Sequence, residues 1–193
     1  RSITDNSLQL LTNLTSMNLD FNKTITDGAL IHLTNLTNIE LFENSSITDL
    51  GISKLIKLTT IELICSNSIT GSTLCYLTNL TNINICGNPS ITDSALLHLT
   101  NIIKLDLSNN HIITDAALLN LTSLTSLILT QNDSITDLGI RNLVNLTDLD
   151  LAGNKNITFD GISHLSHLRY LDLYENNLIP YDYIRRLPYW LRY

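Results

Sequence analysis

Acidic side chains at regular intervals are the residues of this 193-residue sequence that could carry chemistry. Five carboxylates recur at spacings of 22 or 44 residues, namely Glu40, Glu62, Asp106, Asp150 and Asp172. Such a row could hold a cation or attract a basic partner. A calcium ion needs roughly six to eight oxygen ligands that converge on one point, usually from a tight loop. Carboxylates spread along a chain rarely converge in this way, so we expect a basic protein partner and no metal.

Apolar and aromatic residues lie next to these acids in the sequence. Phe42 and Ile64 accompany Glu40 and Glu62, and Tyr170 and Tyr174 accompany the last acids. Aromatic residues among polar ones are typical of binding hot spots, and exposed apolar residues become informative when they are grouped. The alternative is that they are scattered exposed residues, which are common. The sequence predicts a partner-binding surface made of Glu40, Phe42, Glu62, Ile64, Asp106, Ile128, Asp148, Asp150, Tyr170, Asp172 and Tyr174.

Other reactive side chains do not form a recognisable catalytic or metal-binding pattern. His32, His98 and His164 share one spacing but are 66 residues apart, so we expect them to be surface residues. Of the cysteines Cys65, Cys75 and Cys86, we expect only the first and last to approach each other. Glycine-rich phosphate loops, His-x-x-x-His and Gly-x-Ser-x-Gly are absent from the sequence. We therefore predict a protein that is not an enzyme and needs no cofactor.

The elements that position these residues follow from an internal repeat, which is the first pattern to seek in such a chain. An isoleucine begins each of eight consecutive repeats of 22 residues, which run from Ile3 to Leu178 without an insertion. Repeat positions are counted here from that isoleucine, and the repeats are numbered 1 to 8. Positions 6, 9, 12, 15 and 17 are aliphatic or methionine in all eight repeats, and position 20 is asparagine in seven, with Ser66 as the exception. A single repeat cannot bury these apolar residues, whereas stacked repeats can.

Each repeat is expected to contain one strand and one short helix. Positions 14 to 18 alternate, with positions 15 and 17 inward, which predicts a strand. Thr-Asp at positions 2 and 3 is a helix-start signal, because threonine can cap free N–H groups and aspartate suits the positive helix end. Gly71 and Phe159 replace that aspartate in repeats 4 and 8. Position 5 is always small, from which we expect close packing between helices, and the asparagine column should satisfy backbone groups at the turn.

Position 16, occupied by the acids described first, then points outward from the predicted sheet. Positions 14, 16, 18 and 19 together hold nine of the chain's 18 acids and one base, Lys104. These acids are Asp20, Glu40, Glu43, Glu62, Asp106, Asp148, Asp150, Asp172 and Glu175. Like charges on adjacent strands repel, so fold stability does not predict this column. The alternative to a recognition face is a sheet that is only solvated.

The spacing Leu-x-x-Leu-x-Leu-x-x-Asn, as in "LTSLILTQN" (124–132) and "LTDLDLAGN" (146–154), resembles the leucine-rich repeat family. The I-T-D-x-(G/A)-L element, as in "ITDGAL" (25–30), is similar to the cysteine-containing subfamily of F-box adaptors, and "LTNLT" is similar to bacterial internalin repeats. The resemblance implies an α/β fold, a right-handed solenoid with a parallel β-sheet on the concave face and short helices on the convex face. It also implies non-catalytic protein recognition through the concave face.

We expect the solenoid to span residues 1–178 and residues 179–193 to form a partial ninth repeat that caps its end. Tyr181, Tyr183, Tyr189, Trp190 and Tyr193 could instead dock a partner. Because Arg1-Ser2 looks like the tail of an earlier repeat and no similar cap precedes it, we also expect that the natural chain begins further upstream.

Charge and composition narrow the range of partners. The net charge of −7 disfavours nucleic acid, which needs basic surface, and no apolar run is long enough for a membrane helix. Three cysteines point weakly to an intracellular protein, with a secreted effector or surface protein as the alternative. We expect a monomer that binds a protein with a basic surface. The alternatives are the recognition domain of a larger protein, such as an F-box ubiquitin ligase adaptor, a microbial effector or adhesin, or an enzyme, and, more remotely, an ice-binding solenoid.

Overall fold

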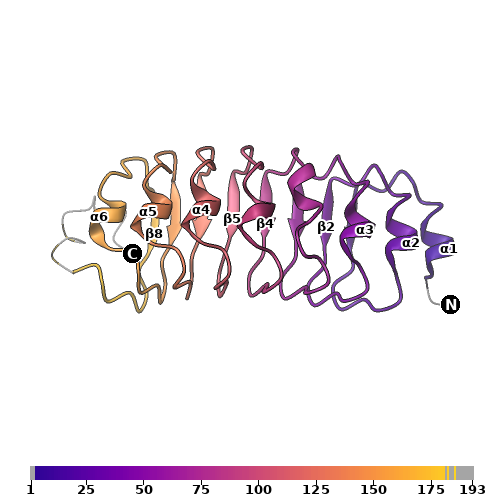
Figure 1. Ribbon diagram of the computed structural model, residues 1–193, viewed down its shortest axis with the longest axis horizontal. Helices are drawn as coiled ribbons and strands as arrows, with labels where there is room; N and C mark the ends of the chain where they lie inside the picture. Colours follow the sequence, from indigo (N-terminus) through magenta and orange to yellow (C-terminus); the bar gives the residue numbers. More distant parts are fainter. Residues whose placement is uncertain (1–2, 181, 183–184, 186–193) are drawn as a thin grey trace.

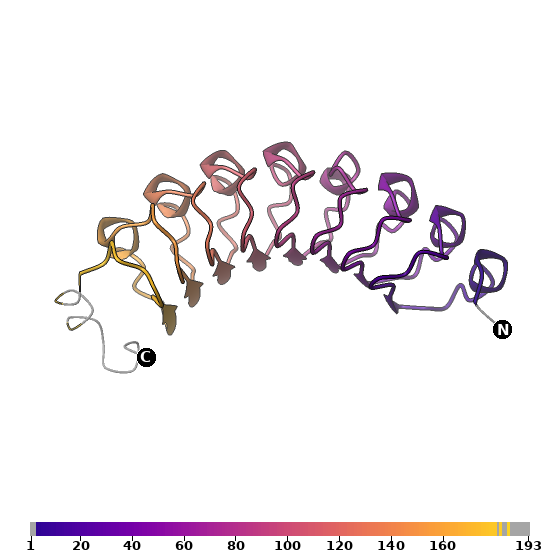
Figure 2. The same ribbon diagram turned by 90° about the horizontal axis from the view of Figure 1, so that it is seen from below.

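The computed structural model describes residues 3–180, 182 and 185, and each of its eight repeats contributes one strand to a single parallel sheet. The strands follow sequence order across the sheet, from β1 to β8. Their bounds are β1 Ser16–Asn18, β2 Asn38–Glu40, β3 Thr60–Glu62, β4 Asn82–Asn84, β5 Lys104–Asp106, β6 Ser126–Ile128, β7 Asp148–Asp150 and β8 Tyr170–Asp172. The strands line the inner side of an arch and the helices its outer side (Figures 1 and 2). The predicted leucine-rich repeat fold, with strands on the concave face and helices on the convex face, is confirmed.

The outer layer consists of single helical turns. The α-helical turns are α1 Asp5–Leu8, α2 Asp27–Leu30, α3 Asp49–Ile52, α4 Asp115–Leu118, α5 Asp137–Ile140 and α6 Phe159–Ile162. Repeats 4 and 5 form the 3₁₀ turns η1 Leu74–Tyr76 and η2 Asp93–Ala95 instead. One turn cannot build the dipole of a long helix, so the predicted attraction of aspartate to a helix end explains little here.

The core fills the space between the two layers. Position 15 of each strand faces inward and pairs with the same position of the next repeat, as in Ile39 with Ile61 and Leu127 with Leu149. The strands are three residues long, which is shorter than the predicted span of positions 14 to 18. The hydrogen bonds between repeats nevertheless continue, because the N–H groups of Leu19 and Phe21 donate to the carbonyls of Glu40 and Phe42 at 2.9 and 2.8 Å.

Every repeat adopts a left-handed backbone conformation at position 19. The residues there have φ between 47° and 62°, namely Phe21, Glu43, Cys65, Gly87, Asn109, Gln131, Gly153 and Glu175. This conformation was not predicted from the sequence. Two of these residues are glycines and a third is Asn109, and glycine and asparagine adopt the left-handed conformation most readily. These three residues were the sequence signal for the turn. The turn ends the strand and directs position 20 into the core.

Asparagine at position 20 ties each repeat to the one before it, as the sequence predicts. The Nδ2 of Asn44 donates to the carbonyls of Leu19 and Asn22 at 2.8 and 3.0 Å, and its Oδ1 accepts from the N–H groups of Ser46 and Ile47. Ser66 in repeat 3 makes only one of these bonds, to the carbonyl of Asn44 at 2.8 Å. Its short side chain therefore leaves this ladder incomplete between repeats 2 and 3.

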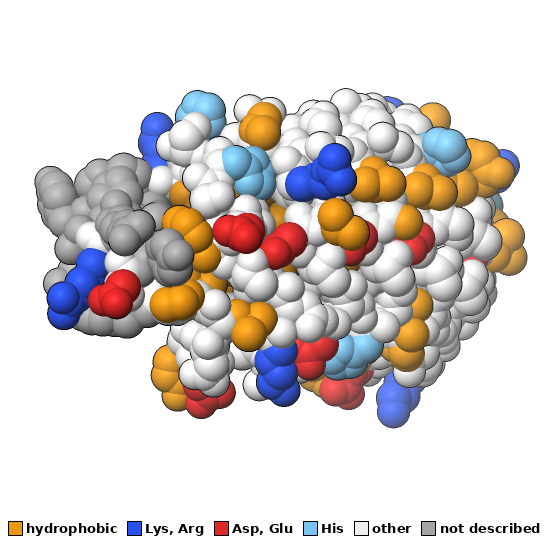
Figure 3. Space-filling view, turned by 60° about the vertical axis from the view of Figure 1, so that its left-hand side comes forward, with side chains coloured by type: hydrophobic (Ala, Val, Ile, Leu, Met, Phe, Trp, Pro, Cys, Tyr) orange, Lys and Arg blue, Asp and Glu red, His pale blue; other side chains and the backbone are white. Residues whose placement is uncertain are grey.

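The aspartate of each Thr-Asp pair forms a second ladder that runs along the convex side. The carboxylate of Asp115 accepts hydrogen bonds from the N–H and Oγ1 of Thr136 in the next repeat, at 2.8 and 2.6 Å. The same pair of bonds is made by Asp5, Asp27, Asp49, Asp93 and Asp137. We call these six aspartates the ladder acids. Acidic side chains follow one another along the helix-bearing side of the molecule in Figure 3. In repeats 2, 3, 6, 7 and 8 the threonine also caps its own helix, as predicted.

The small residue at position 5 makes room for these carboxylates. A Cβ atom on Gly51, Gly139 or Gly161 would overlap the carboxylate of Asp27, Asp115 or Asp137, respectively. Close packing at position 5 was predicted from the small residues there. The group that packs against this position is the carboxylate of the ladder acid from the preceding repeat.

The two repeats without the aspartate behave differently from each other. Gly71 leaves Thr92 of repeat 5 without a carboxylate partner, and the Thr92 hydroxyl contacts that of Ser94 at 3.0 Å. Phe159 precedes a ninth repeat in which Pro180 replaces threonine. Proline has no N–H to donate, so an aspartate at position 159 would lack its usual backbone donor.

The threonines of position 13 are used by the fold itself. The hydroxyls of Thr37, Thr59 and Thr147 donate to the carbonyl of the preceding repeat at 3.0 Å. Because these hydroxyl donors are already bonded to the backbone, the fold explains the threonine column, and the column does not have to be explained by ice binding.

The predicted C-terminal cap can be followed only in part. Ile179 is buried, in register with the first position of the other repeats, whereas Tyr181, Tyr183, Ile184, Leu187, Tyr189, Trp190 and Tyr193 lie outside the described residues. Within the described chain, none of the helices has the length and apolar character needed to cross a bilayer.

Candidate functional site: the concave face

The structure brings the predicted site residues onto one face of the sheet. Glu40 pairs with Glu62, Asp106 with Ile128, and Asp150 with both Ile128 and Asp172, all at position 16 of adjacent strands. Asp148 pairs with Tyr170 at position 14. The residues between them at position 15 are buried. The predicted column is therefore continuous in space, while its binding role stays a prediction.

Three of the five acids at position 16 have a structural role that was not predicted from the sequence. The carboxylates of Asp106, Asp150 and Asp172 each accept a hydrogen bond from the N–H two residues later, at 2.8 to 2.9 Å. Asn18 and Asn84 make the same bond with their amide oxygens. The expectation that fold stability does not explain the column is thus wrong for these aspartates, because position 18 needs an acceptor.

Glu40 and Glu62 are different, since neither accepts the N–H of position 18. The N–H of Phe42 donates instead to Asp20 of the preceding repeat at 2.8 Å. Asn18 Nδ2 donates to Glu40 at 2.5 Å. Within the part of the chain that the structure describes, neither glutamate is ion-paired with a lysine or arginine, and the salt bridge that is present joins Lys155 to Asp133 elsewhere.

The pKa of Glu62 reflects its burial and its acidic neighbours. Partial burial, followed by the negative charges of Glu40, Asp20 and Asp106, raises the pKa of Glu62. A carboxylate whose neighbours disfavour its charge gains when a cation approaches. Glu62 also lines a shallow groove of about 210 Å³, together with Asn84, Lys104, Asp106 and Ile128.

Tyrosines and aspartates form a second cluster at the C-terminal end of the sheet. Tyr170 and Tyr174 are 46% and 71% exposed, and the Tyr170 hydroxyl donates to Asp172 at 3.3 Å. Partial desolvation and then the charges of Asp172, Asp150 and Asp148 raise the pKa of Tyr170. The two rings offer an accessible aromatic surface beside several carboxylates, as the sequence predicts.

At the N-terminal end of the sheet, the predicted cluster of Phe42 and Ile64 has a further aromatic neighbour, Phe21, that was not predicted. Phe42 and Ile64 are half-buried, and the ring of Phe21 packs edge-on against that of Phe42 with centroids 4.7 Å apart. Phe21 is 55% exposed. It occupies position 19, which bends toward the next repeat because of its left-handed backbone. Inspection of that column would have shown a second phenylalanine beside the first.

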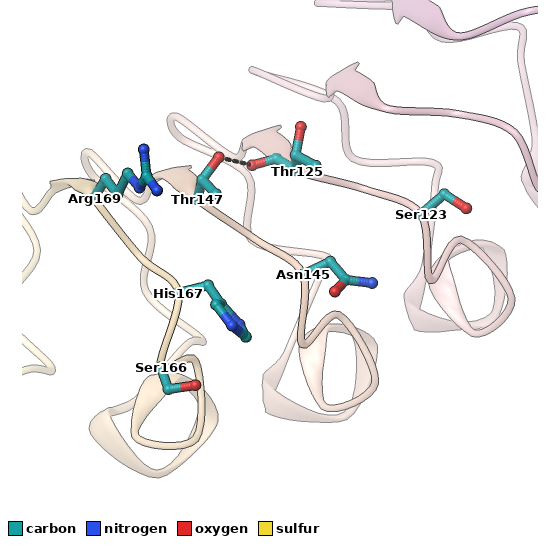
Figure 4. Close-up of a pocket in the computed structure, with 7 residues that line it drawn as sticks. All are labelled: Ser123, Thr125, Asn145, Thr147, Ser166, His167 and Arg169. Atoms are coloured by element: carbon teal, nitrogen blue, oxygen red, sulfur yellow. Dashed lines mark hydrogen bonds between the residues drawn. The ribbon is translucent and has the colours of Figure 1, made fainter.

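A larger open pocket of about 520 Å³ lies away from the predicted site, on the edge of the solenoid where the chain enters strands β6 to β8. Thr125, Thr147 and Arg169 form one row, and Ser123, Asn145 and His167 form a second row nearer the helices (Figure 4). Thr147 Oγ1 donates to the carbonyl of Thr125 at 3.0 Å, and the Asn145 and His167 side chains contact carbonyls of the preceding repeat. His167 and Arg169 replace the usual Asn and Thr of these positions, which was the missed signal.

The remaining reactive side chains lie where the sequence places them. His32, His98 and His164 are exposed, as predicted. Among the described residues, no three histidine, cysteine, aspartate or glutamate side chains gather closely enough to hold a metal ion. All three cysteines are free thiols.

Comparison with known proteins supports the architecture. A sequence profile of the leucine-rich repeat matches residues 98–121, 120–144 and 142–166. The internalin inlF of Listeria monocytogenes is 31% identical with a TM-score of 0.67, over 88% of this chain and 49% of that protein. Internalin C2 of the same organism is 28% identical with a TM-score of 0.63, over 87% of this chain and 71% of that one.

A third solved structure, TLR13 in a TLR13–ssRNA13 complex, shares 24% identity and a TM-score of 0.70 over 91% of this chain and 27% of that one, which is a likeness of fold alone. The chain thus spans about half the length of the first internalin and about a quarter of TLR13. No curated protein matched the sequence.

Proposed function

The chain belongs to the leucine-rich repeat family, and from this premise we propose that its acidic concave face binds a protein with a basic surface. Recognition of other proteins is consistent with the fold. The finer assignment rests on one observation, namely that Glu40 and Glu62 stand side by side, have no basic partner among the described residues, and accept no backbone N–H of position 18. Burial and then repulsion by neighbouring acids raise the pKa of Glu62, and a lysine or arginine from a partner would stabilise its charged form.

The two ends of the face supply contact area to this charge. Tyr170 and Tyr174 at one end, and Phe42 with Phe21 at the other, present aromatic surface of the kind that dominates binding energy. Asp148, Asp150 and Asp172 beside the tyrosines attract the same basic partner. Asp106, Ile64 and Ile128 connect the two ends and supply complementary shape more than energy.

Charge reversal on matched faces tests this proposal. Glu40→Lys with Glu62→Lys changes the concave face, and Asp133→Lys with Asp160→Lys makes the same change of net charge at exposed positions outside it. We expect the native chain and the control to retain a captured partner with similar affinity. The concave double variant should bind it at least tenfold more weakly. Association with the native chain should slow as salt is added. Loss of the partner by the control alone would overturn the assignment.

Aromatic truncation gives a second readout of the same face. Tyr174→Ala should weaken partner binding by more than about 1 kcal/mol, the scale of a hot-spot residue. Phe42→Ala should do the same, although it also exposes the ring of Phe21. Both variants are measured by calorimetry against the native chain, with His98→Ala on the outer side as a neutral control.

The setting in which recognition takes place has two candidates. The likeness to two internalins supports a microbial effector or adhesin. The Ile-Thr-Asp element supports the recognition domain of an F-box-type ubiquitin ligase adaptor. The full-length gene distinguishes them, because an F-box domain beside the repeats would decide for the adaptor.

A further inference from the structure

Two cysteines meet at the junction of repeats 3 and 4, on the rim of the concave face. Cys65 occupies position 19 of repeat 3 and Cys86 occupies position 18 of repeat 4. The N–H of Cys65 donates to the carbonyl of Cys86 at 3.1 Å, so their main chains are direct neighbours. Neighbouring parallel strands lie about 4.8 Å apart and successive residues of a strand rise about 3.3 Å, so a pair offset by one residue has Cα atoms roughly 6 Å apart, within the roughly 4.4–6.8 Å that a disulfide spans.

The same two positions in repeats 1 and 2 hold side chains that touch each other. Phe21 and Phe42 share an equivalent N–H to carbonyl bond of 2.8 Å, and their rings are in contact. The Cys65 thiol itself leans toward repeat 4, because its Sγ lies 3.2 Å from the place where a Cβ on Gly87 would be. Gly87, directly after Cys86, therefore leaves open the space into which this thiol projects.

The two thiols also differ in access. Cys65 is exposed and Cys86 is half-buried. Cys75 belongs to the helical layer, at position 7, where its thiol contacts the carbonyl of Ser72 at 3.7 Å. A soluble oxidant can therefore reach Cys65 directly, and the neighbour available to complete a bond is Cys86, not Cys75.

We propose that Cys65 and Cys86 form a reversible disulfide that fastens repeat 3 to repeat 4 when the chain meets a small-molecule disulfide such as oxidised glutathione. In the first exchange the Cys65 thiolate attacks oxidised glutathione, forms a mixed disulfide and releases one glutathione thiolate. In the second, the Cys86 thiolate attacks the Cys65 sulfur and releases the other glutathione. Two protein thiols are oxidised and one small disulfide is reduced to two thiols, with both protons passing to solvent or to the leaving thiolates.

The intact reduced chain is incubated with oxidised glutathione, and the remaining thiols are alkylated before intact-mass measurement. We expect one alkylated thiol instead of three, with a loss of two hydrogens and no bound glutathione. Cys75→Ser should form the same bridge and leave no thiol to alkylate. Cys65→Ser and Cys86→Ser should form no bridge within the chain, and circular dichroism checks that each serine variant is folded.

A second measurement tests whether the folded geometry suits the bond. Closing a loop of this size should raise the thermal midpoint of oxidised Cys75→Ser on the order of 5 °C above its reduced form. Four results would each overturn the proposal. They are a bridge that requires Cys75, disulfide-linked dimers in place of the internal bond, stable glutathione adducts, and a lower thermal midpoint after oxidation. None of these results depends on whether the concave face binds a protein.

Discussion

Carboxylates of the convex-side ladder and carboxylates of the concave face are the same chemical group in two regions with opposite surroundings. Each ladder acid accepts two hydrogen bonds from a threonine of the next repeat, as Asp115 does from Thr136. Partial burial, and then the charges of neighbouring acids, raise the pKa of Glu62 on the concave face. A backbone N–H donor, and not the place of a carboxylate in an acidic column, separates a structural charge from one that is available to a partner.

The distinction continues within the concave face. Asp106, Asp150 and Asp172 each hold a backbone N–H of their own repeat, whereas Glu40 and Glu62 do not. Asparagine at Asn18 and Asn84 performs the same backbone task without charge. The three aspartates therefore make a structural hydrogen bond that a neutral asparagine can also make. Their negative charge is not needed for that bond.

The largest expected effect is the loss of a ladder acid. Asp115→Ala removes two acceptor bonds at the junction of repeats 6 and 7 and leaves the partly buried N–H of Thr136 without its partner. We expect the free energy of unfolding to fall by about 2–4 kcal/mol. Urea denaturation followed by circular dichroism measures it. Glu62→Gln on the concave face is the matched control and should change stability by less than about 0.5 kcal/mol, and an equal loss in both variants would contradict the distinction.

The next effect concerns the space that a ladder acid occupies. Gly139→Ala places a Cβ against the Asp115 carboxylate and 3.0 Å from Ile135 Cγ2, so we expect a loss of about 1–3 kcal/mol from overpacking. Gly28→Ala is the control, because its Cβ would stand 3.3 Å from Asp5 at the less crowded end of the solenoid. That variant should be neutral or slightly stabilising. Equal thermal midpoints for the two variants would show that the carboxylate does not need this space.

A smaller effect separates the two tasks of a concave-face aspartate. Asp150→Ala removes the acceptor for the N–H of Ala152 and should cost about 1 kcal/mol of stability. Asp150→Asn keeps an acceptor oxygen and should leave stability nearly unchanged, while weakening the binding of a basic partner as much as the alanine does. If asparagine destabilised the chain as alanine does, the charge itself would be structural.

The sequence predicts the repeat, the strand and helix layers, the inward columns and the asparagine ladder, because each follows from periodicity and burial. It also predicts which residues share the concave face, since position 16 has the same orientation in every repeat. The Thr–Asp ladder and the caps of Asp106, Asp150 and Asp172 could not be read from the sequence in this way. They depend on how neighbouring repeats are offset, and on a left-handed turn at position 19 where Phe21 and Glu43 carry no signal of it.

The smallest expected effect is a difference between Asp49 and Glu62 in how their contributions to stability change with pH. Burial alone would raise the pKa of Asp49, but hydrogen bonds from Thr70, Thr73 and Ser72 outweigh it and lower the pKa. Asp49 therefore contributes stability above the carboxyl pKa of the unfolded chain, near 4, and that contribution is lost as pH falls through its lower folded value. Asp49→Asn should be less stable than the native chain at pH 7, and this deficit should shrink below about pH 4.

Glu62 should show the opposite behaviour, because its folded pKa is raised. Its favourable contribution exists below the unfolded pKa and is lost as pH rises through the folded value, so Glu62→Gln should be slightly more stable than the native chain at pH 7. The advantage should disappear as pH falls below about 4. Thermal midpoints of the three proteins between pH 3 and 7 measure both trends. Curves that diverge from the native one in the same direction would mean that Asp49 and Glu62 respond to a shared feature of the fold, and not to their separate donors and charges.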